Sequence, residues 1–180
     1  GSKKGALSPR AYVAQNDCGL GLIVDRISKS KFWMETAIFV LEDDAQNGPD
    51  HVDAHRSACL VISPFIKKHN INHTLYTTAS MLRTMELILG LPPMSQYDAA
   101  ATPMFNAFTT LADTTRYTAE EPRWDLTERN KSGSFGEALM DKFNLKKEDD
   151  VPDREFNEII WRVVTGKQMP APRYSIFSRK

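Results

Sequence analysis

Hydrophobic residues recur at helical spacing near the start of the chain. Leu20, Ile23, Val24 and Ile27 follow the i, i+3, i+4, i+7 pattern that one face of a helix shows. Two glycines interrupt the pattern, and each costs a helix about 1 kcal/mol relative to alanine. The spacing still predicts an amphipathic helix over 12–28.

The clearest helical pattern covers residues 78–89. Met81, Met85 and Ile88 share one face of this stretch, and further leucines flank it. Gly90 then stands where helices commonly end in the left-handed conformation, and the two prolines that follow soon after prevent continuation. These signals predict a helix that ends at residue 89.

Two short runs, over 36–41 and 58–62, are apolar throughout. This pattern is typical of strands covered on both faces, which usually belong to parallel sheets. Two further helices are predicted near 134–143 and 152–165, after a long irregular stretch over 94–131. The order of elements indicates an α/β fold. Two strands are few for a parallel sheet. We therefore expect the chain to be part of a larger domain, or its sheet to be completed by another molecule.

Charge and composition exclude several classes of protein. The chain of 180 residues carries 23 Lys and Arg against 23 Asp and Glu, so its formal net charge is zero. This balance argues against a protein that binds nucleic acid or a membrane surface by bulk attraction. Hydrophobic residues make up 41%, which is enough for a core. No apolar run reaches the roughly 20 residues of a transmembrane helix.

The cysteines and the first residues say little about the cellular compartment. Two cysteines, Cys18 and Cys59, cannot make a disulfide framework, and we expect two buried thiols. The chain does not open with a secretion signal. Gly1 and Ser2 are residues of the kind that a cleaved expression tag leaves, so the natural amino terminus is expected to differ.

The chemistry of the sequence is concentrated in 42–56, directly after the first predicted strand. This segment holds five carboxylates and two imidazoles: Glu42, Asp43, Asp44, Asp50, Asp53, His51 and His55. Adjacent carboxylates repel one another, and a divalent cation removes that repulsion; imidazole adds affinity for zinc, manganese or iron. In open α/β sheets, ligand sites form at the carboxyl ends of strands. A solvated acidic loop is the alternative interpretation.

Other motifs do not fit this segment. A calcium loop of the EF-hand type starting at Asp43 would need Asp or Asn where Ala45 stands, and Glu where Ala54 stands. The chain has no His-Glu-x-x-His pattern, no Walker loop and no Gly-x-Ser-x-Gly elbow. The segment therefore favours metal binding without indicating one of these classes.

The stretch Leu41 to Val52 resembles the late metal-binding motif of the phosphoesterase family. This family includes bacterial acid phosphatases and phosphocholine-type phospholipases C, within the alkaline phosphatase superfamily. The resemblance covers about 12–108, and a weaker one covers 156–166. The stretches that carry it beside the acidic motif are 16–17, 32–33, 61–64, 80–86, 89–94 and 97–104.

The resemblance implies roles for single residues. Asp43 and Asp44 take the place of the paired metal ligands. Asp50, His51 and His55 would support those ligands or add a further one, Arg56 would bind phosphate, and His73 is a possible addition to the site. Arg83 and Glu86, three residues apart on a helix, are expected to form a helix-face pair instead. The metal would be Zn, Mn, Fe, Mg or Ca.

One departure limits what the resemblance implies for this chain. The family's early Glu-Asn type motif and its nucleophile have no counterpart here, so no catalytic residue is expected in this chain and the nucleophile is expected upstream. The implied fold is a partial alkaline-phosphatase-like three-layer α/β sandwich with a mostly parallel sheet and an irregular helical carboxyl-terminal region. We expect a scar and linker over 1–11, the phosphoesterase part over 12–108, and an extended segment with two helices over 109–180.

The implied function is the carboxyl-terminal portion of a metal-dependent phosphoesterase, inactive in isolation. Its partners would be a phosphoester small molecule or lipid and the rest of the phosphoesterase chain, with no nucleic acid. The family resemblance also implies an extracytoplasmic protein, periplasmic or secreted. The alternative is a non-catalytic binding or self-association module, a homo-oligomer that uses exposed strand edges and the 94–131 stretch.

Overall fold

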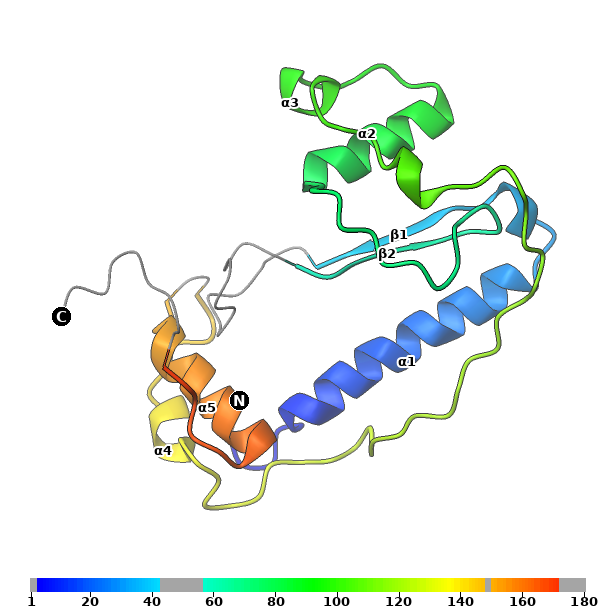
Figure 1. The fold of residues 1–180 in the computed structure, drawn as a ribbon. Coiled ribbons are helices and arrows are strands. Elements are labelled where there is room, and N and C mark those ends of the chain that lie inside the picture. The colour runs from blue at the N-terminus through cyan, green and yellow to red at the C-terminus, as the bar shows by residue number, and fades with distance from the viewer. Residues whose placement is uncertain (1–2, 43–56, 148–149, 172–180) are drawn as a thin grey trace. The chain divides into compact units, whose positions relative to one another are not determined.

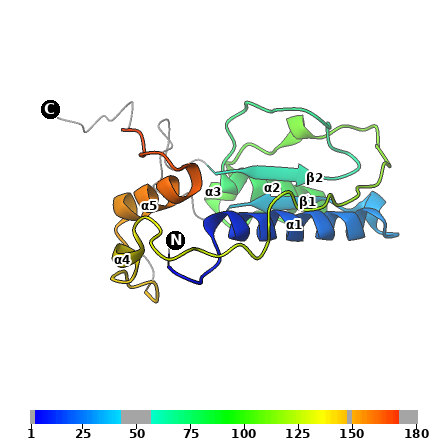
Figure 2. The same ribbon diagram turned by 90° about the horizontal axis from the view of Figure 1, so that it is seen from below.

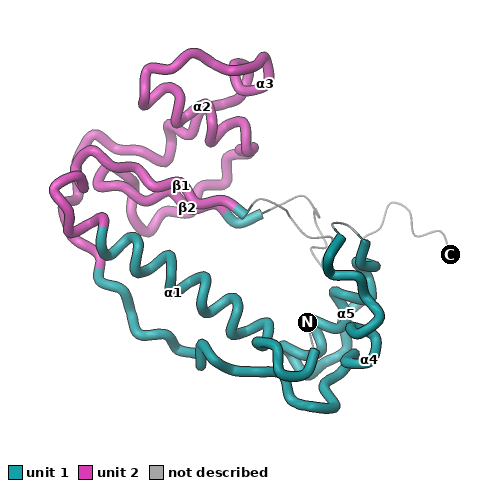
Figure 3. The backbone as a smooth tube through the Cα atoms, turned by 180° about the vertical axis from the view of Figure 1, so that it is seen from behind, with its two compact units in different colours: residues 1–26, 42–58, 118–180 teal, residues 27–41, 59–117 magenta. Residues whose placement is uncertain are grey.

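The computed structural model describes residues 3–42, 57–147 and 150–171. The chain divides into two compact units (Figure 3). Unit 1 comprises residues 1–26, 42–58 and 118–180, and unit 2 comprises residues 27–41 and 59–117. The described residues form helices and one small antiparallel sheet, a mixed α/β composition (Figures 1 and 2).

Helix α1 (Pro9–Ser28) begins three residues before the predicted helix and ends where predicted. Proline suits the first position of a helix because it lacks an amide hydrogen there. The predicted apolar face is only partly covered: Val24 is buried, but Ile23 is 54% exposed. An extended segment after residue 118 contacts the helix, where the Asp25 carboxylate accepts the Ala119 amide at 2.9 Å.

Strands β1 (Ile38–Leu41) and β2 (Cys59–Ile62) pair antiparallel, with Ile38 opposite Ile62 and Leu41 opposite Cys59. The parallel sheet of the expected sandwich is not seen in the described residues. The expectation of cover on both faces is also wrong, because β1 is half-buried and β2 begins with two exposed residues. An apolar run says nothing about the direction of its partner, and a hairpin needs no crossover helix.

The prediction of two buried thiols is wrong. Cys59 is exposed at the start of β2, and Cys18 on α1 is half-buried. The apolar neighbours of Cys59 in the sequence indicated burial, but the sheet leaves this end of the strand uncovered.

In unit 2, helix α2 (Thr78–Leu89) has the predicted bounds. Thr77 and Ser80 form a reciprocal capping box at its start, and Gly90 ends it with φ of 68°. A short helix α3 (Gln96–Ala99) and two 3₁₀ turns, η1 (Trp33–Glu35) and η2 (Phe105–Ala107), complete the unit. The Thr84 hydroxyl accepts the Met104 amide at 2.9 Å, which joins α2 to the chain before η2.

The irregular stretch predicted over 94–131 contains α3 and η2 but otherwise lacks regular structure. Within unit 2 it is fixed to other segments at several points. The Thr109 amide donates to the Phe65 carbonyl at 2.8 Å, and the Trp33 and Tyr117 rings meet edge to face at 5.9 Å. This stretch therefore contributes to the packing of the unit.

In unit 1, helix α4 (Glu137–Met140) is shorter than the predicted helix over 134–143. Gly136 precedes it in the left-handed conformation, with φ of 76°, and so the helix starts only after it. Helix α5 (Asp153–Thr165) confirms its prediction within one residue and ends at Gly166. Ile159 on α5 is 1% exposed and forms the centre of this small core.

None of the helices in the described ranges is both long and apolar enough to cross a bilayer.

Candidate functional site

The predicted metal and phosphate ligands lie outside the described residues: Asp43, Asp44, Asp50, His51, His55 and Arg56. The structure describes the residues on either side of them. The Glu42 amide donates to the Ala58 carbonyl at 3.4 Å, next to the Leu41–Cys59 pair of the sheet. Strand pairing thus brings Glu42 and Ala58 together.

The antiparallel pairing of β1 and β2 differs from the strand arrangement expected around the metal site. The segment begins at the carboxyl end of β1, as expected, but it returns to the amino end of an antiparallel neighbour. The rule for open parallel sheets, in which several carboxyl ends form one site, does not apply to this pair. Among the described residues, no group of three or more His, Cys, Asp or Glu side chains is placed to hold a metal ion. The metal site remains a prediction.

The remaining candidates lie in unit 2. His73 is exposed on the irregular segment before α2 and makes no hydrogen bond to the described residues. Arg83 and Glu86 form the predicted helix-face pair, with 3.2 Å between Nη1 and Oε2. The structure therefore confirms this ion pair, and the role of His73 stays a prediction.

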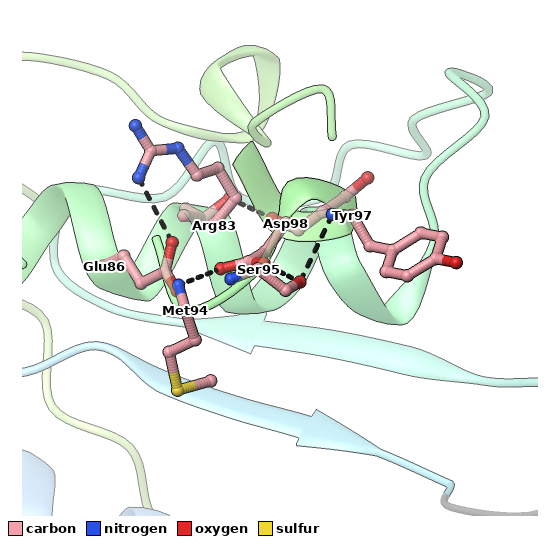
Figure 4. Close-up of polar contacts among 8 residues, drawn as sticks. Arg83, Glu86, Met94, Ser95, Tyr97 and Asp98 are labelled. Carbon is pink, nitrogen blue, oxygen red and sulfur yellow. Dashed lines mark hydrogen bonds and ion pairs between the residues drawn. The ribbon is translucent and has the colours of Figure 1, made fainter. Parts of the chain in front are cut away.

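A buried acidic cluster, which sequence reasoning did not predict, lies where α2 meets α3 (Figure 4). We call it the acid corner and define it as Arg83, Glu86, Ser95 and Asp98. Asp98 is 2% exposed and Glu86 is 3% exposed. The Asp98 carboxylate accepts the Met94 amide at 2.7 Å, the Ser95 amide at 2.8 Å and the Ser95 hydroxyl.

These contacts determine the charge state of Asp98. The Ser95 hydroxyl, which donates to the carboxylate, is the main cause that holds the pKa of Asp98 well below its usual range. Burial acts in the opposite direction, and the hydrogen bond from the Met94 amide adds to the lowering. Asp98 is thus ionised at neutral pH, although it lies inside the unit.

Only one of the two carboxylate oxygens of Glu86 has a hydrogen-bond partner among the described residues. Its Oε2 accepts from Arg83, whereas Oε1 is buried with no hydrogen-bond donor within reach among the described residues. Arg83 is therefore the one partner within the described part of unit 2 that balances an ionised Glu86.

The acid corner fixes the turn between two helices. Asp98 binds backbone donors at the start of α3, and the Leu91 amide donates to the Glu86 carbonyl at 2.8 Å. The pattern Ser95-x-x-Asp98 is a capping box and was visible in the sequence. Its burial was not, because burial depends on how α3 packs against α2.

Acid is expected to destabilise unit 2 through Asp98 and Asp113. Lys68, at 2.8 Å from Asp113, is the main cause that lowers the pKa of that carboxyl. Both folded-state pKa values lie below the unfolded value of about 3.9. Their contribution to stability is therefore present above that value and is lost as pH falls below it towards the folded values. Thermal unfolding measured at a series of pH values checks this.

Asp98→Asn and Asp141→Asn make a matched pair for that measurement. Asp141 is exposed, so its substitution should leave the acid limb of the stability curve unchanged. Asp98→Asn should lower stability at neutral pH and reduce the loss on acidification. Equal pH profiles for the wild type and Asp98→Asn would show that Asp98 carries no such contribution.

No model of a known protein family matches this chain, and no curated protein matches it. The resemblance to phosphoesterases therefore depends on the residues quoted above.

Proposed function

We propose that this chain is the carboxyl-terminal portion of a metal-dependent phosphoesterase that hydrolyses phosphate esters. The observation that carries the proposal is the Asp43-Asp44 pair in the acid-rich sequence that directly follows β1, between the paired strand residues Leu41 and Cys59.

The small sheet supports a partial domain. In the described part of unit 2, β1 and β2 are each paired along one edge. An independently stable sheet commonly needs three or more strands or a covering helix. We propose that the remaining strands of a mostly parallel sheet, within a three-layer sandwich, come from the rest of the phosphoesterase chain.

The residues of this chain would bind the metal and the phosphate, and none of them would act as the nucleophile. Asp43 and Asp44 would hold a divalent cation, with Asp50, His51 and His55 supporting them, and Arg56 would bind the phosphate oxygens in bidentate geometry. The bound metal would polarise the phosphoryl group. The Ser or Thr nucleophile would be supplied from outside this chain, so the isolated chain binds metal weakly and turns over no substrate.

Metal titration tests the proposal. Asp43→Asn or Asp44→Asn should weaken Mn²⁺ or Zn²⁺ binding, measured by calorimetry, at least about tenfold, because each removes a charged ligand. Asp141→Asn is the control, an exposed acid outside the segment. Unchanged affinity in both ligand variants would contradict the site.

A p-nitrophenyl phosphate assay with either metal tests the expected inactivity. We expect no turnover from the chain alone. Turnover that Asp43→Ala abolishes would support the metal ligands but would contradict the expectation that the nucleophile is missing.

A second candidate function is self-association without catalysis. The observation that favours it is the number of large hydrophobic side chains on the surface, including Leu60 on β2 at 49% exposure and Leu89 on α2 at 68%. Size-exclusion chromatography with light scattering tests it, and a monomer at all concentrations would contradict it.

A further inference from the structure

We draw no further inference here: the strongest candidate, the exposed apolar surface at the end of α2 and on the turn after it (Leu87, Ile88, Leu89, Leu91 and Met94), carries none because nothing in the structure shows what covers it.

Discussion

Gly136→Ala is expected to lower the free energy of unfolding of unit 1 by about 3 kcal/mol, from two costs of about 1–2 kcal/mol each. The first is conformational, because Gly136 has φ of 76°, where a Cβ meets its own backbone. The second is steric, because the new Cβ would lie 2.5 Å from Cγ1 of Ile159. Ile159 is 1% exposed and has little room to move aside.

Gly133→Ala separates these two costs. Gly133 has φ of 79°, but a Cβ there would meet nothing within 4 Å. It should therefore cost only the conformational part, about 1 kcal/mol. Urea unfolding followed by circular dichroism measures both variants. Equal losses would show that Ile159 moves aside, and that the packing of α5 against the turn before α4 is looser than these distances imply.

The helices were predictable where local signals define them. The bounds of α2 agree with the prediction because capping residues mark its start and Gly90, in the left-handed conformation, marks its end. Helix α5 has the same kind of end at Gly166. Gly136 lies within the predicted 134–143 helix and is left-handed, so the helix starts only after it and the predicted length was wrong.

The pairing of the strands was not predictable, because it is a property of two segments. The runs over 36–41 and 58–62 indicated strands correctly, but their composition contains no information on direction. The exposure of Cys59 and Leu60 has the same origin. An apolar strand is buried only where another part of the fold packs on it. The sequence pattern of the strand does not show whether such a part exists.

The candidate site was also predictable only in part. The helix-face pair Arg83–Glu86 follows from a spacing of three residues and was predicted. The burial of Asp98 follows from the packing of α3 on α2 and was missed, although its capping box with Ser95 was visible. Spacing alone does not determine how the carboxylates of one connecting segment are arranged, so the metal site at Asp43 and Asp44 stays a prediction.

Arg83→Met is expected to lower the free energy of unfolding of unit 2 by about 2–3 kcal/mol. Methionine keeps much of the length and apolar contact of arginine but removes the charge. The Glu86 side chain is 4% exposed and would then have a donor on neither oxygen among the described residues. A buried carboxylate that loses its partner retains the cost of leaving water without the attraction that offset it.

Glu86→Gln provides the background that isolates this effect. Glutamine keeps the shape of the side chain and removes its charge, so Arg83→Met should cost much less, about 1 kcal/mol, in that background. A double-mutant cycle by urea unfolding measures the difference. If Arg83→Met costs the same in both backgrounds, the arginine acts through packing of its stem on α2. A large difference would instead assign its role to the charge of Glu86, the acid that lies beside Asp98 where α2 meets α3.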